Sequence, residues 1–214
     1  MQSVQAAAAR SDRLVLGFDL AATFLFGLEG ASSAVAGDLD LFGVLVLGFV
    51  TAVGGGIIRD LIIGDVPPAA FRLQRYIVAA LLGAAIAFVI FTPISHVPPW
   101  ALITLDAAGL SLFAVSGASK ALLFGTNALT AIILGVVTGT GGGVIRDVLL
   151  NKVPAILRVD VYASAALLGA VVMTIGVRQG QPRGRMMFIG GGVCFALRLV
   201  AAWQHWGLPR AGAL

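Results

Sequence analysis

The sequence predicts an all-α integral membrane protein of seven transmembrane helices, arranged as an inverted three-plus-three repeat with one further helix. Three observations predict this fold. The 214 residues are 59% hydrophobic and 11% charged, with a mean hydropathy of +1.00, whereas soluble domains average about 25% charged residues. Long apolar runs recur along the whole chain, and its first half is similar in sequence to its second half.

The apolar runs define the predicted helices in order. A spanning helix needs about 20 predominantly apolar residues, and such runs lie at 14–36, 41–63, 73–95, 100–122, 128–150, 160–178 and 186–206. Short connections rich in Gly, Pro and Asn separate them, as turns require. Residues 1–13 are expected to form a polar leader, because they lack the charge and cleavage pattern of a signal peptide. Residues 207–214 are expected to form a C-terminal tail.

An internal repeat groups the first six helices into two sets of three. Residues 19–67 align without a gap on residues 106–154 at a constant offset of 87 (106 − 19), and about 20 of about 50 aligned positions are identical. The third helices still match through residues 81–84 and 167–170. The repeats therefore cover 14–95 and 100–178. An odd number of crossings makes the second copy enter the membrane from the opposite side, and the helix at 186–206 stands outside the repeat.

A glycine triplet followed by an Arg-Asp pair occurs once in each repeat, in the second and fifth helices. The triplets are Gly54, Gly55, Gly56 and Gly141, Gly142, Gly143. Each glycine costs roughly 1 kcal/mol against Ala inside a helix, and freed backbone groups are tolerated at bilayer depth only in protein or beside a watery cavity. We therefore expect these helices to kink or unwind beside a permeation path, near Thr51 and Thr138. The alternative is close helix packing through small residues.

Charged residues inside a membrane are functional hypotheses by default. Depth along the helices predicts that Asp19 pairs with Arg59. The repeat predicts the same on the opposite face for Asp106 and Arg146, with Asp60 and Asp147 near these two clusters. Adjacent residues project about 100° apart on a helix. We therefore do not expect each Arg to form an ion pair with the Asp that follows it. The alternative is that both arginines extend to the interface and pair with nothing.

Two polar stripes are predicted to face the bundle interior. Glu29, the deepest carboxylate, shares a helix face with Ser32 and Ser33, three and four residues on. The equivalent stripe in the fourth helix contains Ser116, Ser119 and Lys120. Such stripes either line an ion path or act as polar contacts between helices, and the sequence leaves both interpretations open.

Other classes of function are not favoured. Residues 139–143 contain glycines but no following Gly-Lys-Ser/Thr, so a nucleotide-binding loop is not expected. His96 and His205 are far apart in sequence, which argues against a metal site. We expect no enzyme activity, no cofactor and no nucleic-acid partner. The net charge of +4 fits basic residues at helix ends, whose distribution puts the N-terminus in the cytoplasm.

The seven runs, the inverted repeat and the doubled Gly-Gly-Gly-x-x-Arg-Asp motif together resemble the prokaryotic trimeric intracellular cation (TRIC) channels. The resemblance covers roughly residues 14 to 206. It implies a homotrimer in the cell (inner) membrane, surrounded by lipids, in which each subunit passes potassium or sodium ions through its own pore. The six glycines of the triplets would be the kinks around that pore.

Two features separate the chain from the animal members of that family. Animal members bind a phosphoinositide through a longer glycine motif that contains a lysine, and both copies here lack that lysine. Their N-terminus lies on the lumenal side, opposite to the side that the basic residues predict here.

Two other classes of function remain open from the sequence. Similar bacterial families have been described as transporters of glycine or other small solutes, and broken helices at a repeat interface are equally typical of a carrier. A purely structural membrane scaffold is a third class, although it would leave the buried charges unexplained.

Overall fold

The fold is described by a computed structural model over residues 2–92, 98–158, 161–204 and 206, with side chains from residue 13 onward. His96, His205 and the expected tail at 207–214 lie outside the described residues. Every regular element in the described residues is a helix, in the order α1 Gln2–Val35, α2 Leu41–Ile63, α3 Ala69–Arg72, α4 Gln74–Phe91, α5 Pro99–Leu123, α6 Ala128–Leu149, α7 Ala155–Arg158, α8 Ala163–Arg178 and α9 Arg183–Trp203.

Six of the described helices are long and apolar enough to cross a membrane, namely α1 from Arg13 onward, α2, α4, α5, α6 and α9. The predicted run at 160–178 forms the shorter α8, whose 16 residues span about 24 Å at 1.5 Å per residue, less than the ~30 Å bilayer core. α1 runs unbroken from Gln2 through the residues of the expected leader. Its four consecutive alanines at residues 6–9 are strong helix formers and explain the continuity.

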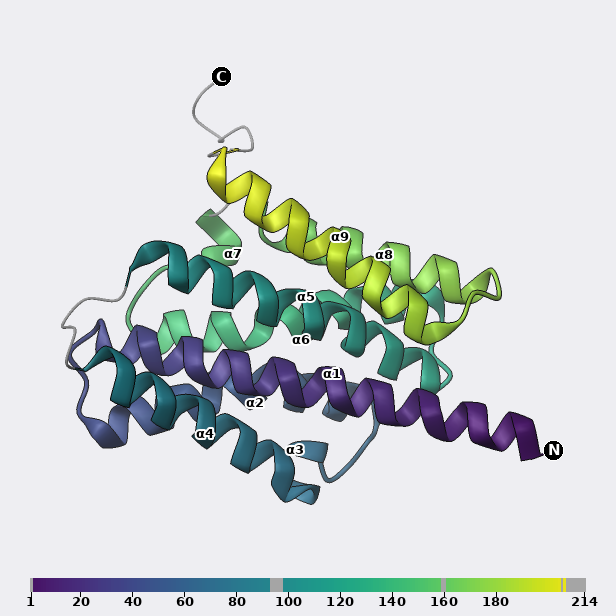
Figure 1. The fold of residues 1–214 in the computed structure, drawn as a ribbon, viewed down its shortest axis with the longest axis horizontal. Helices are drawn as coiled ribbons and strands as arrows, with labels where there is room; N and C mark the ends of the chain where they lie inside the picture. The colour runs from purple at the N-terminus through teal and green to yellow at the C-terminus, as the bar shows by residue number, and fades with distance from the viewer. Residues whose placement is uncertain (1, 93–97, 159–160, 205, 207–214) are drawn as a thin grey trace.

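The two repeats have the same internal arrangement (Figure 1). In the first repeat α1 packs against α2 and α4, and in the second α5 packs against α6 and α8. The repeats meet where α1 contacts α5 and α2 contacts α6, while α9 packs on α5 and α8. Equivalent residues begin α2 and α6: Asp40 accepts a hydrogen bond from the Gly43 N–H at 2.7 Å, and Asn127 accepts one from the Thr130 N–H at 2.9 Å.

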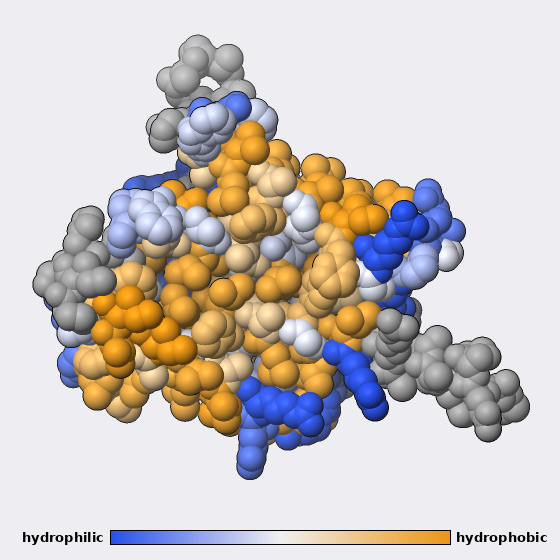
Figure 2. All heavy atoms as spheres, viewed as in Figure 1, coloured by the Kyte–Doolittle hydropathy of each residue, from blue (hydrophilic) through white to orange (hydrophobic). Residues whose placement is uncertain are grey.

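Hydrophobic side chains cover most of the face shown in Figure 2, and hydrophilic residues gather toward its edges. Many large apolar side chains are exposed, including Phe42, Val78, Leu129 and Phe188. Exposed apolar area of this extent would be unfavourable in water, whereas it matches the hydrocarbon of a bilayer. The surface therefore agrees with the composition in indicating a multi-pass membrane protein.

The glycine triplets do not interrupt their helices. α2 and α6 remain α-helical through residues 54–56 and 141–143, so the predicted unwinding is wrong. A bend that keeps the helical hydrogen bonds stays a prediction. The reason for the glycines is close contact: a Cβ added at Gly55 would collide with the carbonyl oxygen of Thr138, and one at Gly142 with that of Thr51. The alternative of close packing through small residues therefore holds at this crossing.

Candidate functional site

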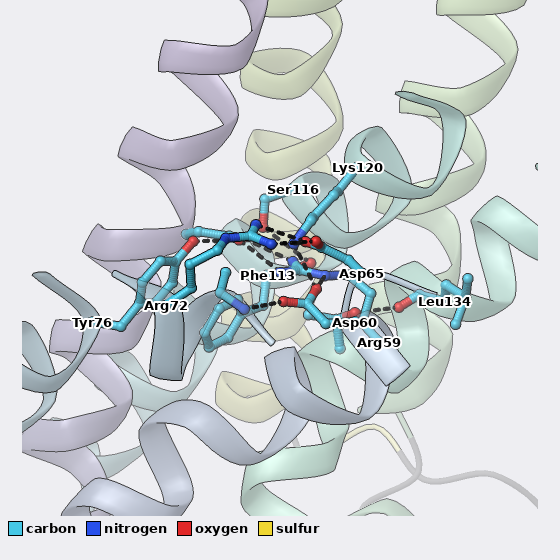
Figure 3. Close-up of polar contacts among 12 residues, drawn as sticks. Arg59, Asp60, Asp65, Arg72, Tyr76, Phe113, Ser116, Lys120 and Leu134 are labelled. Atoms are coloured by element: carbon cyan, nitrogen blue, oxygen red, sulfur yellow. Dashed lines mark hydrogen bonds and ion pairs between the residues drawn. The ribbon is translucent and has the colours of Figure 1, made fainter. Parts of the chain in front are cut away.

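Arg59 is the centre of a buried charged cluster (Figure 3). Its two terminal nitrogens donate to the Asp19 carboxylate at 3.1 and 2.9 Å, and its Nε donates to Asp60 at 2.8 Å. Arg59, Asp19 and Asp60 are each 1% exposed, and the Tyr76 hydroxyl donates to Asp19 at 3.1 Å. The predicted Asp19–Arg59 pair therefore forms, and Arg59 does not extend to the interface.

The same cluster continues toward the loop after α2. Lys120 of α5 lies 2.7 Å from an Asp60 oxygen and 2.8 Å from an Asp65 oxygen. Arg72 of α3 donates to Asp65 at 2.7 Å, and the second Asp60 oxygen accepts from the Ala69 N–H at 2.9 Å, at the start of α3. We call this set the N-terminal cluster: Asp19, Arg59, Asp60, Asp65, Arg72, Tyr76 and Lys120. Its three carboxylates are balanced by three cations.

Outside the bundle core, the charge of Asp65 is stabilised by its partners. Burial alone would raise the pKa of Asp65, but hydrogen bonds from Arg72 and Lys120 outweigh this and hold the pKa below its usual value of 3.8. Asp65 is therefore ionised and ties the loop after α2 to α3 and α5.

A second charged cluster lies toward the opposite ends of α1 and α5. Arg146 of α6 forms ion pairs with Glu29 of α1 and with its neighbour Asp147. The other Asp147 oxygen accepts from the Ala155 N–H at 2.8 Å, at the start of α7, just as Asp60 does for α3. Ser33 donates to Glu29 at 3.3 Å.

Asp106 of α5 has a different set of partners. The Tyr162 hydroxyl donates to it at 2.8 Å, and the Arg198 Nε of α9 lies 3.8 Å from its other oxygen. The Arg198 guanidinium also lies over the Tyr162 ring, 5.3 Å from its centre. We call this set the opposite cluster: Glu29, Asp106, Arg146, Asp147, Tyr162 and Arg198. Three carboxylates here face two guanidinium groups.

Two predictions about ion pairing are wrong, one in the opposite cluster and one in both clusters. Arg146 pairs with Glu29 in place of the predicted Asp106, because the first repeat supplies a carboxylate where the second has Ser116 and because Arg198 neutralises Asp106. Each Arg also bonds the Asp that follows it: Nε of Arg59 reaches Asp60, and Nε of Arg146 reaches Asp147, both at 2.8 Å. The long arginine side chain curls back and overcomes the angular separation.

Three positions break the symmetry between the clusters. At the offset of 87, Glu29 corresponds to Ser116, Ser33 to Lys120, and Asp65 to Lys152. The N-terminal cluster consequently gains Lys120 and Asp65, whereas the opposite end gains Glu29 in the buried cluster and Lys152 in the lining of the adjoining space. The two ends therefore place one extra acidic and one extra basic residue each, but in different positions.

The two clusters also differ in the space beside them. A pocket of only about 10 Å³ lies among the N-terminal cluster residues, enough for about one water molecule. The opposite cluster borders a cavity of about 190 Å³, which is lined by its acidic and basic groups together with Ser33, Lys152, Leu102, Ile103, Leu150 and Ala155. We call this space the opposite cavity.

The other predicted polar residues are buried in the bundle. Thr51 and Thr138 donate to the carbonyls four residues earlier, Leu47 and Leu134, at 2.7 and 2.5 Å, so these hydroxyls serve their own helices. Ser32 does the same toward Leu28. In the α5 stripe, Ser116 and Ser119 are fully buried, and Arg183 of α9 donates to both oxygens of Ser119. The predicted inward direction of both stripes is confirmed.

The sequence reasoning did not identify several members of the two clusters. Arg198 is a charged residue inside an apolar run, and that pattern alone marks it as a candidate functional residue. Tyr76 and Tyr162 occupy equivalent places after the one-residue deletion in the repeat. The four-residue helices α3 and α7 carry too few residues to show a periodic pattern.

Comparison with known proteins identifies relatives over most of the chain. Residues 16–92 and 103–178 match the family model described as Glycine transporter. The UPF0126 inner membrane protein YadS of Escherichia coli K12 is 38% identical over 197 residues, which cover 92% of this chain and 95% of YadS. A UPF0126 membrane protein of Streptomyces coelicolor is 45% identical over 195 residues, covering 91% of this chain and 88% of that protein.

Solved structures with the same fold are also similar in sequence. A TRIC channel orthologue from Rhodobacter sphaeroides gives a TM-score of 0.82 at 37% identity, covering 90% of this chain and 98% of that one. A second structure, solved to explain conductance through TRIC cation channels, gives a TM-score of 0.81 at 39% identity, covering 90% and 95%. The described fold therefore has close structural relatives of known architecture.

Proposed function

The chain belongs to the family that contains the TRIC cation channels and the UPF0126 membrane proteins, and from this premise we propose that it is a monovalent cation channel of the potassium type. It is a multi-pass protein of the inner cell membrane. In the proposal three copies assemble, and each subunit holds its own pathway beside the crossing of α2 and α6. The relatives described as trimeric cation channels support this assembly.

The observation that carries the proposal is the pair of charged clusters at the two ends of this crossing. One end has the N-terminal cluster, which leaves almost no open space, and the other has an open cavity lined by three carboxylates, two guanidinium groups and the exposed Lys152. Carboxylates in a cleft with low-dielectric walls attract cations. Glu29 adds one such carboxylate, since Ser116 occupies its place in the other repeat.

Single-channel recording of purified protein in a planar bilayer tests the proposal. Discrete current steps in potassium chloride, with a reversal potential that follows the cation gradient, are expected. Glu29→Gln removes a negative charge from the opposite cavity and should lower the conductance. Lys152→Gln removes a positive charge from the same lining and should raise it. Current without steps, or identical conductance in both variants, would contradict the assignment.

A secondary transporter of glycine or another small solute is the second candidate. The family model is described in these terms, and a cavity of about 190 Å³ on one side opposite a pocket of about 10 Å³ is also what a carrier open to one side requires. Proteoliposomes separate the two functions. Saturable uptake of labelled glycine at a fixed stoichiometry, with no steps in the bilayer, would favour the carrier.

A further inference from the structure

The opposite cavity presents carboxylates to any cation that enters it, whatever the valence of that cation. Its lining holds three carboxylates and three basic groups, namely Glu29, Asp106, Asp147, Arg146, Arg198 and Lys152. Each carboxylate attracts a divalent cation twice as strongly as a monovalent one, and carboxylate oxygens are the ligands that hard divalent cations prefer. A path for potassium therefore needs a feature that keeps divalent cations from occupying this cavity.

Two of the three carboxylates are engaged by ion pairs and hydrogen bonds. Arg146 forms ion pairs with one oxygen of Glu29 and one oxygen of Asp147. The second oxygen of Asp147 accepts from the Ala155 N–H at 2.8 Å. The second oxygen of Glu29 has no hydrogen-bond partner among the described residues. Glu29 therefore keeps one oxygen whose bonding capacity the protein leaves unused.

Asp106 is balanced by a charge that lies beside it without a hydrogen bond. The Tyr162 hydroxyl donates to one of its oxygens at 2.8 Å. The Arg198 Nε lies 3.8 Å from the other oxygen, which is longer than a hydrogen bond. At the equivalent place in the first repeat, Asp19 receives two hydrogen bonds from Arg59. Arg198 therefore acts on Asp106 mainly through its positive charge.

Arg198 is held beside the cavity by contacts that the repeat does not supply. Its guanidinium lies over the Tyr162 ring, 5.3 Å from the ring centre, and the residue is only 6% exposed. It belongs to α9, which packs on α5 and α8. Because arginine is not deprotonated in proteins, α9 places a permanent positive charge in the lining. Lys152 is exposed, so solvent and salt screen its charge.

We propose that Arg198 makes the pathway selective for monovalent over divalent cations. The inference rests on the proposed cation channel. With Arg198 in place, three negative and three positive formal charges line the cavity. Without it one negative charge is in excess, and Glu29 and Asp106 both offer oxygens to a cation in the same space. A fixed positive charge repels a divalent cation twice as strongly as a monovalent one, so Arg198 acts mainly against divalent ions.

The remaining ligand chemistry agrees with a role for charge. Among the described residues, no group of three or more acidic, histidine or cysteine side chains is arranged to hold a metal ion. A divalent cation in the opposite cavity would therefore be held by electrostatic attraction to separate carboxylates. Attraction of this kind changes when a single charge in the lining is removed.

Barium block of the potassium current in a planar bilayer tests the proposal, because barium and potassium ions have nearly the same radius and differ in valence. The natural protein should be half-blocked only above about 1 mM barium, weaker than protein sites built for calcium. Arg198→Gln should lower the half-blocking concentration by about tenfold or more. Half-block of the natural protein below about 1 mM, or an unchanged half-blocking concentration in the variant, overturns the proposal.

Matched variants separate the charge of Arg198 from its packing. Arg198→Lys keeps the positive charge and should keep the weak block. Arg198→Met places a flexible apolar side chain beside Tyr162 and should show the tight block of Arg198→Gln, also where the glutamine variant does not fold. Arg158→Gln removes an exposed cation of α7 that is not part of the cavity lining and should be blocked like the natural protein. Tight block in Arg198→Lys or in Arg158→Gln overturns the proposal.

The two proposals fail in distinguishable ways. A natural protein without current steps overturns the channel and, with it, the selectivity at Arg198. Current steps with the same barium block in the natural protein and in Arg198→Met overturn only the role of Arg198.

Discussion

Arg59 makes three buried hydrogen bonds to carboxylates. It joins α2 to α1 through Asp19, it also bonds Asp60 of its own helix, and it is only 1% exposed. Breaking a buried ion pair leaves the surviving charge without a partner, which typically costs about 3–5 kcal/mol. The residue therefore contributes to stability mainly through the penalty that its loss would create.

A double-mutant cycle measures this coupling. Asp19→Asn and Arg59→Gln should each lower the free energy of unfolding in detergent by about 3–5 kcal/mol. The double variant should lose less than the sum, because both charges are then removed together. Strictly additive losses would show that the two residues do not interact.

Asp65 gives a pH dependence that can be assigned to one residue. Its folded-state pKa is lowered below 3.8, so its ion pairs stabilise the protein above that value, and this contribution disappears as the pH falls through the lowered folded-state pKa. Asp65→Asn should unfold at a lower temperature than the natural protein at pH 7, and the difference should shrink as the pH approaches 3. A constant difference across this range would count against the assignment.

At this scale the sequence was informative about which residues are buried and less informative about which ones pair. Depth along the helices was enough for Asp19 and Arg59, since antiparallel neighbours bring them level. It failed for Arg146, because three carboxylates compete on that side and the geometry of α9 decides among them. A helix outside the repeat has no equivalent from which its position could be inferred.

The close packing of the two repeats depends on the crossing of α2 and α6. Gly55 and Gly142 face the partner helix at backbone distance, whereas a Cβ at Gly56 would meet its nearest neighbour, Arg59, only at 3.9 Å. The triplets thus contain positions of unequal importance, which neither composition nor spacing distinguishes.

Alanine substitution should separate these positions. Gly55→Ala and Gly142→Ala force the helices apart, so we expect a lower unfolding temperature and altered potassium flux. Gly56→Ala adds a methyl group in ordinary contact and gains the higher helix propensity of alanine, about 1 kcal/mol against glycine. It should be neutral or stabilising in the same measurement. Equal destabilisation by all three variants would contradict the contact geometry.

Helix boundaries illustrate what apolar runs can predict. The runs at 41–63 and 128–150 agree with α2 and α6 to within one residue, because Asp40 and Asn127 cap their starts. In the run at 160–178, residues 161 and 162 are not helical and α8 begins at Ala163. The unwinding expected at the triplets failed for another reason: glycine permits a break, but dense packing against a neighbour keeps the helix intact.

For the whole molecule, the proposed assembly is a homotrimer. Helix association in membranes relies on close packing of small residues and on interhelical polar contacts, and the exposed surface here is predominantly apolar (Figure 2). Chemical crosslinking in native membranes followed by mass measurement in detergent should give a species of three times the 21.9 kDa subunit. A monomer or dimer under both conditions would contradict the proposal.

Glu29 and Ser116 occupy equivalent places in the two inverted repeats. This difference has a consequence for the direction of ion movement. Two identical three-helix units placed head to tail would present the same mouth to both sides of the membrane and could not distinguish inward from outward movement. Glu29 and Lys152 at one mouth, and Lys120 and Asp65 at the other, remove that equivalence. Ion current along the proposed path should therefore rectify, and Glu29→Ser, which restores the serine of the other repeat, should bring the current–voltage relation closer to symmetry about zero.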